Sequence, residues 1–450
     1  MYQLGIIGGG PAGYVAAERA GQKGLKVVIF EAKDLGGVCL NEGCIPTKSF
    51  LYSAKLFDQA KGGSKYGILN EGTGFDYDKI LKRKNRIVKK MVGSVGAKMK
   101  HNHVDVVKGQ AIIKGRKDGV IMVESGEDTY QLENLLICTG SESAIPPIPG
   151  LSLSSDYLLT NREALQLDSL PESLTVIGGG VIGLEFASFF NSMGVTVTVV
   201  EMLDEILMGM DKELSSELRK QFEKKGITFH LSSKVTKVDG GQVHFESNGE
   251  VHTINSAKIL VSTGRRPVVD GFGLENLGVE LFKGGIKVNE KMATNIPNVY
   301  AAGDVTGFSL LAHTASREGE VVVNNLTGRK DHMRYNAIPG VVYTNPEFSG
   351  VGLTEEAARA KNIDYDVVRL PMAYAGRFTI ENEGGSGFIK LLLGKKYKEV
   401  LGVHMLGNPS SEMIYGAVMA IEMEMTQKQL QEIVFPHPTV SEIFKEALFV

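Results

Sequence analysis

Two stretches of the chain repeat one pattern of hydrophobic and small residues. In the first, an apolar run from Leu4 leads into the glycine cluster at 8–13, and the small residues that follow predict a helix over Tyr14 to Ala20. The second copy runs from Leu174 through the glycines at 178–183. A short apolar run, a glycine turn and a small-residue helix are typical of the strand, turn and helix of a parallel α/β sheet.

Each predicted helix is followed by a second strand that ends in an acidic residue. β-Branched segments over Lys26 to Phe30 and Val195 to Val200 predict these strands, which end at Glu31 and Glu201. Each acid therefore lies eighteen residues after the last glycine of its turn. The pattern predicts two complete Rossmann-like units, each able to bind a nucleotide.

The last quarter of the chain has a different pattern. From about Tyr335, short β-rich segments alternate with helical ones, which predicts a separate α+β domain of about 115 residues. The predicted strands are Gly340 to Tyr343, Gly387 to Leu393 and Glu399 to Met405, and the predicted helices are Thr354 to Lys361 and Ser411 to Met425.

Breaks in the pattern predict the domain boundaries. The proline-rich run Pro146 to Gly150 cannot continue a helix or a central strand, and a second change falls at Arg265 to Pro267. After that second change we expect the chain to return to the first nucleotide unit, which is then discontinuous. The predicted segments are 1–145 and 265–334 for the first domain, 146–264 for the second and 335–450 for the third.

Composition and charge narrow the class of partner. The chain has 450 residues, a formal net charge of -3 and three cysteines. This charge predicts no general attraction to nucleic acid or to an acidic membrane, and no apolar run reaches the roughly 18 residues of a spanning helix. The start MYQLGIIGGG enters a strand directly, so we expect a cytoplasmic protein. Three cysteines are too few for a secreted disulfide framework, so a close pair among them indicates a role in a reaction.

The segment from Lys82 to Lys100 is rich in Lys and Arg. We interpret it as a solvated helix face rather than a nucleic-acid site, with Ile87, Val88, Met91 and Val92 packed inward.

A different physical requirement explains each glycine of the two turns. The first permits the tight turn, the second lets the backbone approach a pyrophosphate, and the third lets the helix pack on the strand, with phosphate charge at the helix N-terminus. An acid at the end of the second strand binds a ribose diol and repels a 2′-phosphate. Glu201 therefore favours NAD over NADP at the second unit.

The motif GGVCLNEGCIPTK, residues 36–48, gives the clearest indication of a reaction. Cys39 and Cys44 can close a small disulfide ring if Cys44 begins a helix, and Pro46 suits such a start. The helix dipole and Lys48, four residues further on, would favour a thiolate at Cys44. Metal ligation and two inert cysteines are the alternatives, and no second Cys/His pair of suitable spacing supports the first. Cys138 lies in an apolar run and is interpreted as a core residue.

On these motifs the chain resembles the class I pyridine nucleotide-disulfide oxidoreductases over essentially its whole length. The resemblance implies an α/β fold of two Rossmann-like domains, for FAD and NAD, and a C-terminal α+β dimerisation domain. It implies that Cys44 faces the flavin as a charge-transfer thiolate, that Cys39 exchanges with the substrate, and that Glu185 pairs with Lys48 near the nicotinamide. The matching FAD positions are Gly8, Gly10, Gly13, Glu31, Gly37, Val38, Lys48, Ala111, Gly140, Asp304 and Ala312. The matching NAD positions are Gly179, Gly180, Gly183, Glu201, Val235 and Gly264.

Three further segments indicate a subgroup within the family. Leu311 to Ala315 and Val342 to Glu347 resemble segments of the dihydrolipoamide dehydrogenases. The run HPTVSE resembles the family's base motif, in which His437 is held by Glu442 and serves the active site of the other subunit of a homodimer. The partner implied is a lipoyl domain or lipoyl carrier protein of a 2-oxo acid dehydrogenase or glycine cleavage complex.

The sequence departs from the family pattern in two places. Val268 replaces the usual Asn after Arg-Arg-Pro, and Ala375 to Gly387 does not look standard. No second cysteine pair occurs near the C-terminus, which weighs against mercuric reductase and large thioredoxin reductase. Three alternatives stay open: a glutathione-type disulfide reductase, a non-catalytic scaffold of a multienzyme complex, and a flavin oxidase or diaphorase with an incidental disulfide.

Overall fold

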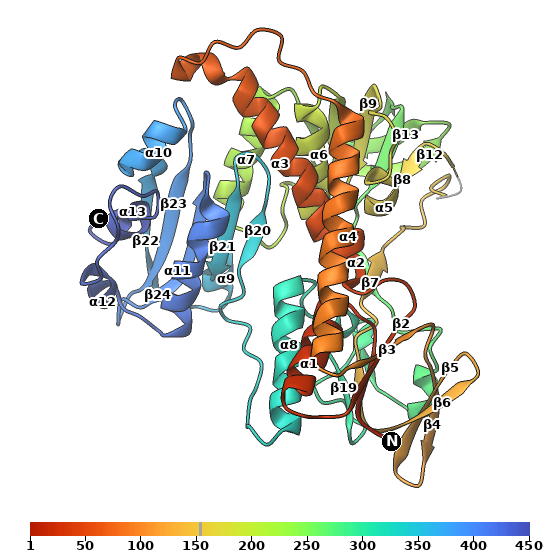
Figure 1. Ribbon diagram of the computed structural model, residues 1–450. Coiled ribbons are helices and arrows are strands. Elements are labelled where there is room, and N and C mark those ends of the chain that lie inside the picture. Colours follow the sequence, from red (N-terminus) through yellow and green to blue (C-terminus); the bar gives the residue numbers. More distant parts are fainter. Residues whose placement is uncertain (153–154) are drawn as a thin grey trace. The chain divides into compact units, whose positions relative to one another are not determined.

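The computed structural model describes residues 1–152 and 155–450, which separate into two compact units (Figure 1). The first unit contains residues 1–49, 78–144 and 264–334, and the second contains residues 50–77, 145–263 and 335–450. Residues 50–77 differ from the expected division, which assigned them to the first segment. They belong to the second unit because Phe50 stacks on Phe189 with ring centroids 4.6 Å apart, and the Tyr77 hydroxyl donates to the Leu167 carbonyl oxygen.

The first unit is built on a seven-stranded sheet in the order β3-β2-β1-β6-β5-β4, with β19 also paired to β6. The pairs β1–β2, β2–β3, β1–β6 and β6–β19 are parallel, whereas β4, β5 and β6 form an antiparallel meander. The strands are β1 Tyr2–Ile7, β2 Val27–Glu31, β3 Asp105–Lys108, β4 Ile112–Lys117, β5 Val120–Ser125, β6 Asp128–Ile137 and β19 Val299–Ala301. Its helices are α1 Pro11–Gln22, α2 Gly37–Asn41, α4 Tyr77–His101, of which Tyr77 clusters with the second unit, and α8 Ala312–Leu326, with the first residues of α3 Cys44–Lys61.

The pairing of β19 explains how the first unit closes. Val299 lies in register with Leu135 and Ala301 with Ile137, although some 160 residues separate the two strands in the sequence. All four residues are essentially inaccessible to solvent, as expected for parallel strands that are covered on both faces. The smaller pairs of this unit are β7 Ser141–Ser143 with β16 Arg265–Pro267, and β17 Leu281–Phe282 with β18 Gly285–Ile286.

The second unit repeats the nucleotide-binding topology. Its parallel sheet has the order β11-β10-β9-β15-β8, and an antiparallel sheet β12-β13-β14 follows β11 in the chain. The strands are β8 Leu158–Leu159, β9 Ser173–Ile177, β10 Thr196–Val200, β11 Thr228–His230, β12 Ser233–Asp239, β13 Gln242–Ser247, β14 Glu250–Asn255 and β15 Lys258–Val261. The helices are α5 Asn161–Ala164, α6 Val181–Ser192 and α7 Lys212–Lys224.

The C-terminal part of the second unit is an antiparallel sheet in the order β20-β21-β24-β23-β22, with helices around an apolar core. The strands are β20 Gly340–Val342, β21 Phe348–Gly352, β22 Tyr365–Pro371, β23 Phe388–Gly394 and β24 Val400–Leu406. The helices are α9 Glu355–Ala360, α10 Gly376–Glu381, α11 Ser410–Glu422, α12 Gln427–Gln431 and α13 Glu442–Ala447. The short 3₁₀ helices of the chain are Gly63–Tyr66, Leu274–Leu277, Asp304–Thr306 and Met372–Tyr374.

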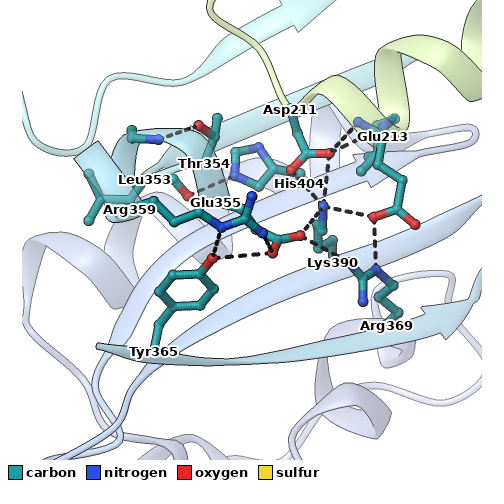
Figure 2. Close-up of polar contacts among 12 residues, drawn as sticks. Asp211, Glu213, Leu353, Thr354, Glu355, Arg359, Tyr365, Arg369, Lys390 and His404 are labelled. Atoms are coloured by element: carbon teal, nitrogen blue, oxygen red, sulfur yellow. Dashed lines mark hydrogen bonds and ion pairs between the residues drawn. The ribbon is translucent and has the colours of Figure 1, made fainter. Parts of the chain in front are cut away.

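A buried ionic cluster joins the nucleotide-binding part of the second unit to its C-terminal sheet (Figure 2). Lys390 is only 2% exposed, and its Nζ lies 2.9 Å from Asp211 Oδ2, 2.8 Å from Glu213 Oε2 and 2.7 Å from Glu355 Oε1. Burial lowers the pKa of Lys390, but its hydrogen bonds to the three carboxylates outweigh that effect and raise it. Asp211 also caps α7 by accepting from the backbone N–H of Glu213 and Leu214.

The inward face of α4 differs from the prediction. Lys84, Val95 and Met99 are the buried residues of this helix, whereas Met91 is 38% exposed. Val88 and Val92 are half-buried on the same side, at helical spacing from the buried three. The predicted grouping with Met91 was wrong because Met91 lies toward the edge of this stripe, and a Lys occupies a buried position.

Within the described part of the chain, every helix is too short or too polar to cross a bilayer.

Candidate active site

The two glycine turns have nearly the same backbone geometry. Gly8 has φ +104° and Gly178 has φ +106°, a region that a side chain rarely adopts. A Cβ on Gly8 would lie 2.2 Å from the Cys138 carbonyl oxygen, and one on Gly178 would lie 2.6 Å from the Ser262 carbonyl oxygen. Both turns are therefore pressed against the neighbouring strand end in the same way.

The third glycine of each turn lets the helix pack closely on the turn. A Cβ on Gly13 would lie 1.9 Å from the Gly8 carbonyl oxygen, and one on Gly183 would lie 2.4 Å from the Gly178 carbonyl oxygen. Neither distance is compatible with a side chain, so both helices, α1 and α6, need glycine here. The packing role that the sequence predicts for these glycines matches the geometry.

The middle glycines, Gly10 and Gly180, precede the first residues of α1 and α6. Both have an extended backbone, and neither helix has a side-chain hydrogen bond at its N-cap. A Cβ on Gly180 would meet no heavy atom of the described chain within 4 Å. An uncapped helix start with open space at the glycine fits a phosphate group, which would accept from the first N–H groups of the helix.

The strand-end acids hold the turns in place. Glu31 Oε2 accepts from the Gly9 N–H at 2.7 Å, and Glu201 Oε2 accepts from the Gly179 N–H at 2.5 Å. The second oxygen of Glu31 accepts from the Lys33 N–H at 2.7 Å, and that of Glu201 accepts from the Leu203 N–H at 2.8 Å. Each carboxylate is thereby fixed beside its turn, where a ribose diol can donate to its remaining lone pairs.

The cysteine motif spans two helices of the first unit. Cys39 lies in α2, and Cys44 is the first residue of α3, so the predicted helix start is present. No disulfide joins the two sulfurs in this structure. A hydrogen bond with Cys44, burial and repulsion by the Cys44 sulfur raise the pKa of Cys39, while the charge of Lys48 opposes the rise. Cys39 is therefore harder to deprotonate than an isolated thiol.

The segment around the two cysteines is fixed by its own backbone. Gly36 and Gly37 have φ +95° and +57°, and a Cβ on Gly37 would lie 2.7 Å from the Gly10 Cα. Asn41 Nδ2 donates to the carbonyl oxygens of Gly37 at 2.9 Å and Leu35 at 3.2 Å. The cysteine motif is thus packed directly on the first glycine turn.

A second polar group of the first unit surrounds Asp304. The Ser141 hydroxyl donates to Asp304 Oδ2 at 2.5 Å, and Arg265 Nε donates to that hydroxyl at 2.8 Å. Burial raises the pKa of Asp304, against the lowering effects of Ser141 and Arg265. The predicted Asp304 is thus anchored at the carboxyl end of β19, as a ribityl-binding residue would need to be.

The other predicted residues lie at various places in the two units. Ala312 begins α8, Ala111 is buried just before β4, and Gly140 and Gly264 have positive φ values of 73° and 127°. Val235 is buried in β12 of the second unit, and Val38 lies in α2 of the first. Glu185, 3% exposed in α6, accepts from the Tyr343 N–H at 3.1 Å. Because Glu185 and Lys48 lie in different units, their pairing stays a prediction.

The C-terminal base motif forms a local pair. His437 Nδ1 lies 2.8 Å from Glu442 Oε1, and Glu442 Oε2 accepts from the Thr439 N–H at 2.8 Å. The hydrogen bond from Thr439 and, to a smaller extent, that with His437 hold the pKa of Glu442 below its usual value. The His437 side chain is 81% exposed, so its second ring nitrogen can accept a proton from a molecule that reaches this surface.

Sequence reasoning missed three residues that support these groups. Glu318 is fully buried in α8 and accepts from the Gly303 N–H at 2.6 Å, which fixes the turn before Asp304. Arg265 was predicted only as part of a domain boundary, and Ser141 only follows the predicted Gly140. The Arg-Arg-Pro motif gave a signal for Arg265, whereas nothing in the local pattern indicated Glu318.

Comparison with known proteins decides the family. The chain matches the model of the pyridine nucleotide-disulphide oxidoreductases over residues 2–319, and the model of that family's dimerisation domain over residues 338–448. The chain belongs to this family. The predicted family, fold class and cofactors, FAD and NAD, are confirmed, and the dimerisation domain supports a homodimer.

Curated relatives match nearly the whole chain. It is 39% identical to a dihydrolipoyl dehydrogenase of Rhizobium etli over 99% of this chain and 97% of that protein. A mitochondrial dihydrolipoyl dehydrogenase of Homo sapiens is 37% identical over 98% of this chain and 89% of its own length. Among solved structures, the HOCl-induced flavoprotein disulfide reductase RclA of Escherichia coli matches with a TM-score of 0.87 and 27% identity over the full length of both chains. LpdA of Mycobacterium tuberculosis, 24% identical over 100% of this chain and 99% of that chain, shares the fold with a TM-score of 0.92.

The glycines of the second turn give a matched test of this site. Gly183→Ala places a methyl group 2.4 Å from the Gly178 carbonyl oxygen, so we expect the free energy of unfolding to fall by about 1–3 kcal/mol. The methyl group of Gly180→Ala meets no protein atom, so the stability of this variant should stay at the wild-type value. Its KM for NAD should rise at least about tenfold, because the methyl group would occupy the position expected for a phosphate of NAD. Thermal unfolding and KM for NAD check both variants. Wild-type NAD binding by Gly180→Ala would contradict the assignment.

Proposed function

We propose that the protein oxidises protein-bound dihydrolipoamide with NAD, through a Cys39–Cys44 disulfide and FAD. The observation that carries this proposal is the cysteine pair at the start of α3, packed on a nucleotide-binding turn, in a chain whose full-length relatives are dihydrolipoyl dehydrogenases. We assign residues 1–145 and 265–334 to the FAD domain, 146–264 to the NAD domain and 335–450 to the dimerisation domain.

The residues of the chain account for the sulfur chemistry. His437 removes a proton from one substrate thiol, and the resulting thiolate attacks the Cys39 sulfur of the oxidised pair. The Cys39–Cys44 bond breaks, and Cys44 leaves as a thiolate at the helix start, where the dipole stabilises it. The second substrate sulfur then attacks its neighbour in the mixed disulfide, closes lipoamide and releases Cys39, which takes up a proton.

The electron balance closes with the two cofactors. Dihydrolipoamide loses two electrons and two protons, NAD gains a hydride, and one proton is released. Bound FAD supplies the two-electron relay between the Cys44 sulfur and NAD.

The remaining parts of the proposal concern orientation and partners. Glu442 holds the His437 ring by one nitrogen, which leaves the other to take the substrate proton. In a homodimer, we assign His437 to the active site of the partner subunit, and Lys48 with Glu185 to the nicotinamide. The dithiol would arrive on a lipoyl domain or lipoyl carrier protein of a 2-oxo acid dehydrogenase or glycine cleavage complex. A cytoplasmic location stays a prediction.

Steady-state kinetics of the purified holoenzyme test this function. We expect NADH production from dihydrolipoamide and NAD, with NADP a poor substitute because Glu201 would face its 2′-phosphate. Glutathione disulfide with NADPH should give negligible turnover. Efficient reduction of glutathione disulfide, together with inactivity toward dihydrolipoamide, would replace the proposal by a glutathione-type reductase.

A further inference from the structure

The exposed side of α4 is strongly basic. The helix contains nine Lys and Arg residues and a single acid, Asp78, in a chain whose formal net charge is -3. Lys82, Arg86, Lys89 and Lys90 are all exposed. Arg86 follows Lys82 by four residues, and Lys89 and Lys90 follow Arg86 by three and four, so they form one stripe along the helix. The buried stripe that includes Lys84, Val95 and Met99 lies on the opposite side.

This basic stripe lies close to the first residues of α3, the helix that begins at Cys44. Arg83, next to the stripe, donates from Nη1 to the Ser49 hydroxyl at 2.9 Å and to the Ser49 carbonyl oxygen at 3.2 Å. Ser49 is in α3, five residues after Cys44, which corresponds to about 8 Å along the helix axis. These two hydrogen bonds hold this part of α4 against the first residues of α3, within the first unit. The stripe thus flanks the end of the first unit where the cysteine pair lies.

The size and sign of this charge indicate a macromolecular partner. The dihydrolipoamide group itself is uncharged, so a row of cations beside the cysteines gives it no electrostatic attraction. A carrier protein that brings the dithiol to Cys39 comes to the end of the first unit that the stripe flanks, and an acidic one would be attracted over about a Debye length, roughly 8 Å at physiological salt. Like charges spaced along one helix face also repel one another, which an acidic partner would relieve.

We propose that the stripe of Lys82, Arg86, Lys89 and Lys90 docks the acidic face of the carrier domain that bears the dithiol. The inference rests on the proposed function, since it names the surface through which that substrate is delivered. Its main effect is on the association rate, because charges at the rim of an interface steer the encounter and contribute less to the final contact.

The test compares two forms of the same dithiol. Arg86→Gln/Lys89→Gln/Lys90→Gln removes three charges while it keeps residues that favour a helix. With an acidic lipoylated carrier domain, kcat/KM of this variant should fall about tenfold at low salt, and its salt dependence should flatten. With free dihydrolipoamide, kcat and KM should stay at the wild-type values. The matched control is Lys283→Gln/Lys287→Gln/Lys291→Gln, which removes three exposed charges from another segment of the same unit. Its kinetics should match those of the wild type with both substrates.

Several outcomes would overturn the proposal. An equal loss with both substrates would place the effect at the active site, and an equal loss in the control triple would reduce it to net charge. Unchanged carrier kinetics, with loss of binding to duplex DNA or to phosphatidylserine vesicles, would assign the stripe to that other ligand. If the wild-type enzyme oxidised neither free nor carrier-bound dihydrolipoamide, the proposed function itself would fail, a result distinct from these.

Discussion

Cys44→Ser should lower the oxidation of dihydrolipoamide by NAD at least about a thousandfold, because the variant cannot form the disulfide that accepts the substrate electrons. Cys39→Ser should lose as much activity for the same reason. The two variants should nevertheless differ in absorbance. Only Cys39→Ser keeps the sulfur at the start of α3, so only it should retain long-wavelength absorbance from a thiolate beside the flavin.

The third cysteine provides the control for this prediction. Cys138 is buried, and burial raises the pKa of its thiol. Cys138→Ser should therefore keep the kcat of the wild type, even if its stability falls. Substantial turnover of dihydrolipoamide by Cys44→Ser would show that the cysteine pair is incidental and would favour a flavin oxidase or diaphorase. Steady-state rates with NAD and a visible spectrum of each variant give the answer.

His437→Gln should lower kcat/KM for dihydrolipoamide by about 10²–10⁴-fold, because the substrate thiol then has no positioned base. Glu442→Gln should cost less, at least about tenfold, since the imidazole remains but loses the carboxylate that orients it through the 2.8 Å contact. The pH profile of kcat/KM should lose the limb that the base contributes. Reduction of an artificial one-electron acceptor by NADH should continue in both variants, because it requires no substrate deprotonation.

An exposed histidine elsewhere is the matched control. His332 lies at the surface of the first unit, and His332→Gln should leave both the rate and the pH profile unchanged. An unaltered pH profile in His437→Gln would remove this residue from the mechanism. A loss of activity with NADH and the artificial acceptor would instead indicate that the C-terminal domain had been disturbed.

The sequence predicted the parts of the site that depend on local geometry. A glycine that must adopt φ near +105°, as Gly8 and Gly178 do, leaves a signature within a few residues, and so do two cysteines spaced around a helix start. The His437–Glu442 pair is also local, since the two residues are five apart. In each of these cases, the residues that carry the chemistry lie within one short segment of the chain.

Other features depend on which distant segments meet. Lys390 could not be predicted as buried, because its three carboxylate partners come from α7 and its cap and from α9, far away in the sequence. A pattern rule places a Lys on the surface, yet paired charges can be buried. The buried Lys84 in α4 misled the assignment of that helix face, because the same rule places a Lys on the surface.

An anaerobic titration of the holoenzyme with dihydrolipoamide, followed by addition of NAD, tests the thiolate–flavin centre and its substrate together. We expect long-wavelength absorbance after one equivalent of dithiol, and its bleaching as one equivalent of NADH forms. A flavin spectrum that dihydrolipoamide leaves unchanged, but that NADH bleaches readily, would refute the proposed function and would direct the search to another disulfide.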